Sequence, residues 1–253
     1  LRKINKITAI NTIKDFNIKD YAAFNFIFNQ YDIKKKISIE DLGFLIGPIL
    51  NAGGRLGKSH LASELLSSDK LDIIIFKSKE LIKLNNKRKK IERITLDEIN
   101  FHSIEKENRN IVIYYNSTIN EGLIGIIAAR LKDYFNKPAI VITNSGDILK
   151  GSARSVYNYN IGRAIKNSFD KNIIIGGGGH SMAAGFTLEK SNLDRFKDFI
   201  SKDITRSVTF NNHAFTYDAE ISSQALNKDF YNDIKRLEPF GTGNPNPIFL
   251  FKD

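Results

Sequence analysis

The sequence contains no cysteine among its 253 residues, which excludes disulfides, thiolate metal sites and a cysteine nucleophile. No apolar run approaches the roughly 20 residues of a membrane span, and no signal-peptide pattern opens the chain. These absences fit the reducing cytoplasm, so we expect a cytoplasmic protein without a membrane partner. The chain begins at Leu1 and its one methionine is Met182, so we expect a portion of a longer protein.

Several catalytic signatures are also absent. The four histidines, at positions 60, 102, 180 and 213, are scattered and form no H-x-x-x-H, D-x-D or D-H-H cluster. The sequence therefore predicts no metal site within these residues. It has no G-x-x-x-x-G-K-[ST] phosphate loop, and "GSARS" is not the G-x-S-x-G nucleophile elbow. A nucleoside-triphosphate site and a serine hydrolase are thus unsupported.

Basic side chains outnumber acidic ones, with 38 lysines and arginines against 28 aspartates and glutamates, a net charge of +10. This balance suggests a polyanionic partner such as nucleic acid. Lysine, asparagine and isoleucine are abundant throughout, however, as the codon bias of an AT-rich genome also predicts. Charge alone leaves both explanations open.

Apolar periodicity divides the chain into four parts. Residues 1–70 show mainly helical patterns, and 71–107 read as one long polar helix with apolar positions at three- and four-residue steps. Over 108–207, strand patterns alternate with helical ones, which is typical of an α/β domain. Residues 208–253 are turn-rich and contain two further strand patterns, so we expect a new domain to start there.

Local patterns give finer expectations. Ser38 and Asp41 are spaced as a helix capping box. "NAGGRLG" at 51–57 is expected to form a loop after Pro48, and "NIIIG" at 172–176 a strand. We interpret the basic "NKRKK" cluster at 86–90 as a solvated helix face, with phosphate contact as the alternative.

Three stretches combine glycine with basic or polar side chains: "LNAGGRLG" (50–57), "KGSARS" (150–155) and "GGGGH" (176–180). Glycine lets backbone N–H groups approach phosphate oxygens, and arginine adds a charged, often bidentate, fork. Together they would make a cradle for a phosphodiester. Each alone also has a structural explanation: a turn, an edge strand, or a glycine run with a structural histidine.

Taken together and in this order, the motifs resemble those of the RecJ-type single-strand-specific exonucleases of the DHH phosphoesterase superfamily. "DLGFLIGPILNAGGRLG" resembles the end of the family's catalytic DHH domain, and "LNNKRKKIE" a signature in its interdomain helix. "EGLIGIIAARL", "LKGSARS" and "GGGGHSMAAGF" are similar to successive DHHA1 motifs, and "LEPFGTGNPNPIF" to the entry of an OB-fold.

The fold class that this resemblance implies is α/β. It comprises the helical end of a DHH domain (1–70), a long connecting helix (71–107), a DHHA1 domain whose mixed sheet is flanked by helices (108–207), and the truncated start of an OB-fold β domain (208–253).

The implied activity is 5′-to-3′ exonucleolytic hydrolysis of single-stranded DNA in recombination and repair, with Mn²⁺ or Mg²⁺. The metal ligands of that family lie in upstream motifs that this chain does not contain, so we expect no hydrolysis by this chain alone. The resemblance implies a catalytic role for His180. It implies phosphate or nucleic-acid contacts for Asn51, Arg55, Ser152, Arg154, Ser155, Gly177, Gly178 and Gly179.

Asn120 stands where family members commonly carry a histidine. Asparagine still donates a hydrogen bond but cannot shuttle a proton, so we retain Asn120 as a candidate substrate contact only. The resemblance further implies a monomer, with single-stranded DNA as its ligand and a single-strand-binding protein or a helicase as candidate protein partners.

Three alternatives remain. A DHH–DHHA1 phosphodiesterase for short oligonucleotides or cyclic dinucleotides would share the glycine-histidine motif, but is not expected to carry the OB-fold entry. A non-catalytic nucleic-acid-binding module would bind single strands in a salt-dependent way without turnover. A DHHA1-like part of an aminoacyl-tRNA synthetase is disfavoured by the long helix and the OB-fold entry.

Overall fold

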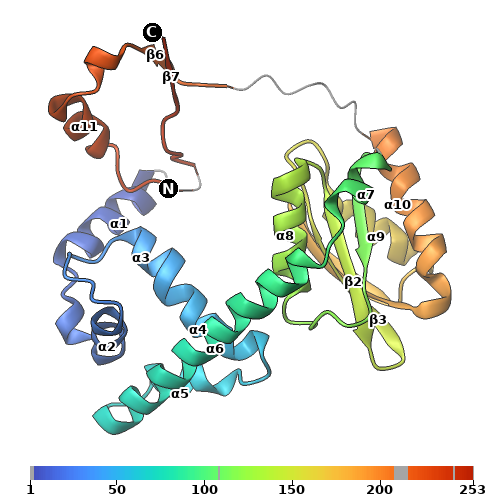
Figure 1. Cartoon of the computed structure of the whole chain (residues 1–253), viewed down its shortest axis with the longest axis horizontal. Helices are drawn as coiled ribbons and strands as arrows, with labels where there is room; N and C mark the ends of the chain where they lie inside the picture. The colour runs from blue at the N-terminus through green and yellow to red at the C-terminus, as the bar shows by residue number, and fades with distance from the viewer. Residues whose placement is uncertain (1–2, 108, 208–215, 242, 253) are drawn as a thin grey trace. The chain divides into compact units, whose positions relative to one another are not determined.

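A computed structural model of the chain describes residues 3–107, 109–207, 216–241 and 243–252 (Figure 1). The chain divides into two compact units. The first comprises Leu1–Pro48, Leu65–Ser78 and Phe210–Asp253, and the second comprises Ile49–Glu64 and Lys79–Thr209. Within the described ranges, no helix is long and apolar enough to cross a membrane.

The first unit begins with helices: α1 (Lys3–Asp15), η1 (Ile18–Asp20), α2 (Ala22–Gln30), α3 (Ile39–Asp41) and the π-helical η2 (Leu42–Ile46). α2 buries Ala23, Ile27 and Phe28. The predicted capping box is confirmed, because the Ser38 hydroxyl accepts from the Asp41 N–H at 3.2 Å and the Asp41 carboxylate accepts from the Ser38 N–H at 2.9 Å.

The carboxy-terminal part of the first unit contains β6 (Ala219–Ile221), η4 (Ser223–Ala225), α11 (Lys228–Lys235) and β7 (Phe249–Phe251). β6 and β7 pair in parallel, and Phe230 of α11 packs edge-on against Phe249 at 5.2 Å between ring centroids. The predicted domain border at 207/208 falls next to residues 208–215, which lie outside the described ranges. All three predicted domain borders, at 70/71, 107/108 and 207/208, stay predictions.

The predicted loop at 51–57 is wrong over its first five residues, because α4 (Gly47–Arg55) runs through both central glycines. Pro48 is the second residue of α4, which follows the π-helical turn of η2 without a break. Packing explains why position 53 is a glycine: a Cβ there would lie 2.5 Å from the Lys58 carbonyl oxygen and 3.2 Å from Leu81. A short helix, α5 (His60–Leu66), follows.

The predicted single helix over 71–107 is also wrong near its end. α6 (Leu71–Asp97) stops, and a separate α7 (Phe101–Lys106) begins after Asn100, whose side-chain oxygen accepts from the Ser103 N–H at 2.9 Å. Asparagine favours this capping position over a helix interior. Ile99, in the break between the helices, is buried in the core beneath the sheet.

The second unit contains a five-stranded mixed sheet in the order β1-β2-β3-β5-β4. The strands are β1 (Val112–Tyr115), β2 (Ala139–Ser145), β3 (Ile148–Arg154), β4 (Gly176–His180) and β5 (Ala183–Glu189). β1 and β2 are parallel, and the other neighbours are antiparallel. The predicted α/β fold with a mixed sheet is confirmed. The predicted strand at 172–176 is wrong, since the glycines themselves form β4 while Ile173 and Ile174 are buried before it.

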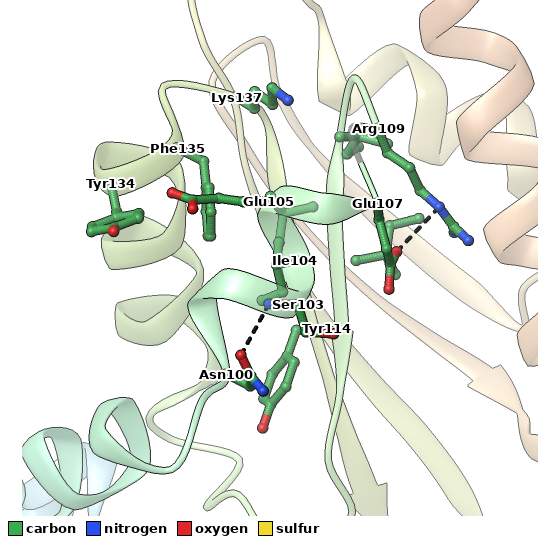
Figure 2. Close-up of a pocket in the computed structure, with 13 residues that line it drawn as sticks. Asn100, Ser103, Ile104, Glu105, Glu107, Arg109, Tyr114, Tyr134, Phe135 and Lys137 are labelled. Carbon is green, nitrogen blue, oxygen red and sulfur yellow. Dashed lines mark hydrogen bonds and ion pairs between the residues drawn. The ribbon is translucent and has the colours of Figure 1, made fainter.

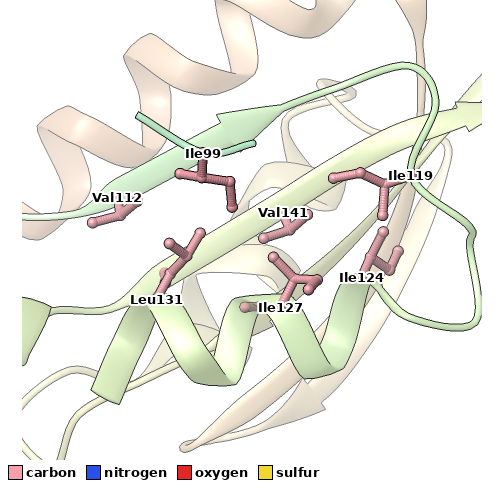
Figure 3. Close-up of a cluster of buried hydrophobic side chains, with 9 residues drawn as sticks. Ile99, Val112, Ile119, Ile124, Ile127, Leu131 and Val141 are labelled. Carbon is pink, nitrogen blue, oxygen red and sulfur yellow. The ribbon is translucent and has the colours of Figure 1, made fainter. Parts of the chain in front are cut away.

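Helices cover both faces of this sheet. α8 (Ile124–Phe135) packs on one face, where Ile124, Ile127 and Leu131 meet Val112 and Val141 (Figure 3). On the other face lie α9 (Ile161–Asp170) and, after η3 (Lys190–Asn192), α10 (Leu193–Ser207). Phe196 of α10 contacts Phe186 of β5, with 4.5 Å between the rings.

Candidate nucleic-acid interface

The pairing register of β3, β5 and β4 brings the predicted site residues together. Ser152 lies opposite Gly185, which lies opposite Gly178; in the next row Arg154 lies opposite Ala183, which lies opposite His180. Residues directly opposite in antiparallel strands point to the same face. Ser152, Arg154, Gly178 and His180 therefore share one face of the sheet, although they are up to 28 positions apart in sequence.

That face is covered by α8 only in part. Gly125, in the first turn of α8, lies so close that a Cβ would be 3.0 Å from Arg154 Nη2 and 3.1 Å from Ser152 Oγ. Beyond these side chains, a Cβ at Gly176 or Gly178 would have no neighbour within 4 Å, and one at Gly185 only an oxygen at 3.8 Å. We call this floor of Gly176, Gly178 and Gly185, of which the last two are exposed, the glycine shelf. It leaves the backbone open to close approach by a ligand.

The other two glycines of β4 have a packing reason. A Cβ at Gly177 would lie 2.8 Å from Phe186 and 2.9 Å from Ile165, and one at Gly179 would lie 2.3 Å from the Ala183 carbonyl oxygen. Successive residues of a strand face opposite sides of the sheet, so the glycines of β4 serve two different purposes. Gly178 lies on the open face, whereas Gly177 and Gly179 allow close packing. A ligand contact stays a prediction for all three.

Replacing Gly179 with alanine should therefore destabilise the second unit by about 1–3 kcal/mol, since backbone atoms have to move to admit the methyl group. The matched Gly178→Ala variant should fold at least as stably, because its methyl group enters open space and the unfolded chain loses freedom worth about 0.4–1 kcal/mol. Urea unfolding of both variants measures this difference. Equal stabilities would contradict the assignment of the two faces.

Arg55 reaches the site from the last turn of α4. Its guanidinium Nη1 donates to the Gly122 carbonyl oxygen at 3.0 Å, while a Cβ at Gly122 would lie only 2.0 Å from the Arg55 carbonyl oxygen. Asn120 Oδ1 accepts from the Gly122 N–H at 2.9 Å. Asn120 thus shapes the turn that holds Arg55, a positioning role that the sequence motif did not reveal.

Arg55 and Arg154 lie close enough to repel each other. Burial lowers the pKa of the Arg154 guanidinium, and the positive charge of Arg55 lowers it further. Burial also lowers the pKa of Arg55, with the charge of Arg88 acting in the same direction and Glu92 opposing it. Both guanidinium groups remain charged at neutral pH. Their mutual repulsion makes the site favourable for an anion.

The hydrogen bonds of Arg154 point to the same conclusion. Its Nη1 donates to Ser152 Oγ at 3.2 Å and to the Ala153 carbonyl oxygen at 2.8 Å. Across the described ranges, neither Arg55 nor Arg154 forms an ion pair with a carboxylate. The amino-terminal end of α8, which starts at Ile124 beside Arg154, adds the partial positive charge of a helix dipole. These groups together suit a phosphate.

A buried ion network lies on α6, close enough to Arg55 to affect its pKa. Arg88 Nη1 donates to Glu92 Oε2 at 2.8 Å, and Arg130 Nε of α8 donates to Glu92 Oε1 at 2.9 Å. Arg88 and Glu92 are only 9% and 7% exposed. The interpretation of the 86–90 cluster as a solvated face is therefore wrong for Arg88. The spacing of Arg88 and Glu92 by four residues was the signal that could have revealed this pair.

Two other predicted site residues, Ser155 and Asn51, do not line the glycine shelf. Ser155 is buried, and its hydroxyl donates to the Tyr159 carbonyl oxygen at 2.6 Å. Its surroundings give it a role inside the fold and offer no support for a nucleic-acid contact. Asn51 is exposed on α4, one helical turn before Arg55, and so lies on the same side of that helix.

The residues of the site do not fit a divalent metal ion. The side chains at the rim of the glycine shelf are two arginines, a serine and His180, and a cation beside two guanidinium groups would be repelled. Throughout the part of the chain that the structure describes, no group of three or more histidine or carboxylate side chains is arranged to hold a metal ion.

A separate cavity of about 410 Å³ lies between α7, β1 and the end of α8 (Figure 2). Its lining includes the Glu107–Arg109 ion pair, at 3.2 Å, and the aromatic rings of Tyr114, Tyr134 and Phe135. β1 and β4 are the opposite edges of the sheet. This cavity therefore belongs to the edge away from the glycine shelf.

Comparison with known proteins agrees with this architecture. The family model of the DHHA1 domain matches residues 108–206, and that of the RecJ OB domain matches residues 217–253. The single-stranded-DNA-specific exonuclease RecJ of Haemophilus influenzae is 30% identical over 231 residues, or 85% of this chain, and that of Escherichia coli is 29% identical over 229 residues, also 85% of this chain. This chain spans 39% of the length of either relative.

Solved structures share the fold. The crystal structure of RecJ in complex with Mn²⁺ from Thermus thermophilus superposes with a TM-score of 0.80 at 22% identity, covering 91% of this chain and 34% of that protein. A second structure of the same protein, with Mg²⁺, has a TM-score of 0.75 and covers 90% of this chain and 35% of that protein.

Proposed function

This chain belongs to the RecJ-type exonucleases through its DHHA1 and RecJ OB domains, and from this premise we propose that it supplies the phosphate-binding surface of a 5′-to-3′ exonuclease of single-stranded DNA. One observation carries the proposal. The cross-strand register puts Ser152, Arg154 and His180 around a bare glycine shelf on one face of the sheet. Relatives matching 85% of the chain are named single-stranded-DNA-specific exonucleases, which supports this substrate class.

In the proposed complex, a phosphate of the single strand lies between Arg154 and Arg55. Charge-assisted hydrogen bonds from the two guanidinium groups replace their mutual repulsion with attraction to the phosphate oxygens. The Ser152 hydroxyl donates to the same group, and the shelf at Gly178 lets the strand approach the backbone. His180, at the end of the shelf, contacts the reacting phosphate and is the catalytic residue that this chain contributes.

The Mn²⁺ or Mg²⁺ ions of the whole enzyme are, in this proposal, held outside the described residues of this chain. The match to the RecJ OB domain supports long single strands over the dinucleotides cleaved by DHH–DHHA1 phosphodiesterases. A monomeric state, and a single-strand-binding protein or helicase as partner, stay predictions.

The proposal is tested by measuring binding of a labelled single-stranded oligodeoxynucleotide to the 253-residue chain over a salt series. We expect the logarithm of the affinity to fall with the logarithm of salt concentration by about 0.7 for each phosphate contacted. An unlabelled dinucleotide should compete far less well than a long strand. Binding that does not depend on salt, or no binding at low salt, would refute the phosphate surface.

The same sample tests turnover. With Mn²⁺ added, a 5′-phosphorylated strand should keep its length, because the described residues offer no ligand set for the ion. Shortening of the strand in proportion to the amount of chain would overturn the expectation that this chain alone does not hydrolyse DNA.

A further inference from the structure

The loop that follows Arg154 is tied to the turn between β4 and β5. The Ser155 N–H donates to the Met182 carbonyl oxygen at 2.9 Å, and the Ile161 N–H donates to the Ser181 carbonyl oxygen at 3.1 Å. These bonds bracket residues 156–160. The loop and the turn therefore form one corner of the sheet, immediately next to His180.

The loop is also anchored from inside. Tyr159 is 1% exposed, and its hydroxyl donates to Asp203 Oδ2 of α10 at 2.9 Å. Burial and the Asp203 carboxylate raise the pKa of the Tyr159 phenol, so it keeps the proton that it donates. Together with the bond from the Ser155 hydroxyl to the Tyr159 carbonyl oxygen, this contact fixes the course of the loop.

On this fixed loop, Tyr157 points its ring into solvent. It is 93% exposed, the highest value among the large apolar side chains of the described residues, and Met182 on the adjoining turn is 45% exposed. Single exposed apolar side chains are common and need no explanation by themselves. The position of Tyr157 distinguishes it, because three residues of chain keep it within about 10 Å of Arg154.

We propose that Tyr157 stacks against an unpaired base of the strand whose phosphate lies at Ser152 and Arg154. This inference rests on the proposed function and adds a base contact to its phosphate contacts. An aromatic side chain on a rigid support next to a cationic groove is the arrangement by which proteins bind single strands irrespective of sequence. Base-paired DNA hides the face that Tyr157 would contact, so this contact favours single strands.

The test compares a labelled thymidine oligodeoxynucleotide with an abasic strand of the same length. Tyr157→Ala should weaken binding of the thymidine strand by about 5- to 150-fold. Tyr157→Phe should bind as the unmodified chain does, because the ring is retained. On the abasic strand, the Tyr157→Ala variant and the unmodified chain should bind equally.

Two controls accompany this test. Tyr134→Ala removes another exposed tyrosine, at the far end of α8, and should leave binding of both strands unchanged. The thermal midpoint of Tyr157→Ala should match that of the unmodified chain, since the ring buries almost no surface.

The outcomes separate the two proposals. If the unmodified chain binds and Arg154→Ala weakens binding, but Tyr157→Ala binds the thymidine strand as tightly as the unmodified chain, the stacking role is wrong and the phosphate surface stands. A loss of the same size on both strands also refutes stacking. If the unmodified chain does not bind, or Arg154→Ala has no effect, the proposed function fails and the stacking role fails with it.

Discussion

Replacing Arg154 with alanine should weaken the binding of a single-stranded oligonucleotide by about 10- to 150-fold. A hydrogen bond to a charged group contributes about 1.5–3 kcal/mol, and each 1.4 kcal/mol corresponds to a factor of ten in affinity. The slope of log affinity against log salt should fall by about 0.7, because one phosphate contact is lost. Fluorescence anisotropy over a salt series measures both quantities.

The stability of this variant should not fall in parallel. The Arg154 guanidinium is half-buried, is repelled by Arg55 and, across the described ranges, forms no ion pair with a carboxylate. Its removal therefore takes away an unfavourable interaction along with two hydrogen bonds. A residue whose loss weakens binding this much, while the unfolding midpoint stays within the range of ordinary surface substitutions, is placed for its ligand.

Two matched variants sharpen this experiment. Arg154→Lys keeps the charge but loses the planar fork, so it should bind at an intermediate affinity with an unchanged salt slope. Arg195→Ala removes an exposed arginine from α10, on the opposite face of the sheet, and should bind as the unmodified chain does. Equal weakening by Arg195→Ala and Arg154→Ala would mean that binding follows net charge and requires no site.

The sequence predicted the glycine run as a ligand site but could not show why four glycines stand together. Motif order pointed to bare backbone near a phosphate, and the open face at Gly178 agrees with that idea. The need for Gly177 and Gly179 comes from Phe186, Ile165 and Ala183, which become neighbours only once β4, β5 and α9 assemble. A contact between distant segments leaves no trace in local periodicity.

The predicted boundaries of α4 and α6 were wrong for a related reason. Glycines at 53 and 54 predict a break by propensity, yet α4 continues through both. At position 53 a side chain would not fit, since a Cβ would lie 2.5 Å from the Lys58 carbonyl oxygen and 3.2 Å from Leu81. Tertiary packing outweighs a propensity cost of about 1 kcal/mol per glycine. The end of α6 at Asp97 could have been predicted, since Asn100 is a typical capping residue for a new helix. The apolar repeat, which continues to Ile99, instead favoured a single helix.

Replacing Glu92 with glutamine should destabilise the second unit by about 3–5 kcal/mol. Glu92 accepts from Arg88 at 2.8 Å and from Arg130 at 2.9 Å, and it is 7% exposed. In Glu92→Gln the Arg88 charge stays buried without a carboxylate partner, and only neutral acceptors face it: Asn85 Oδ1, at 3.1 Å in the unmodified chain, and the new amide oxygen. An uncompensated buried charge has this cost. Hydrogen exchange of the amides of residues 79–97 in α6 and of α8, which all belong to the second unit, reports the stability of this unit separately from the other.

The same helix supplies a control. Arg93 and Asp97 form an ion pair at the same four-residue spacing, but both side chains are largely exposed. Asp97→Asn should therefore cost only about 0.3–0.5 kcal/mol. Replacing both Arg88 and Glu92 by methionine should recover most of the lost stability, because the buried charge goes with its partner. Both ion pairs have the same four-residue spacing, so the difference in unfolding free energy between Glu92→Gln and Asp97→Asn measures the effect of burial.

The network also acts on the candidate site through its charge. The positive charge of Arg88 lowers the pKa of Arg55, and Glu92 opposes it. The Glu92→Gln protein that remains folded should therefore bind a single strand at least as tightly as the unmodified chain, because the potential at Arg55 becomes more positive. If the variant instead keeps its stability and loses affinity, Glu92 orients Arg55 for the ligand and does not neutralise a buried charge. Stability and binding measured on the same sample decide between these two roles.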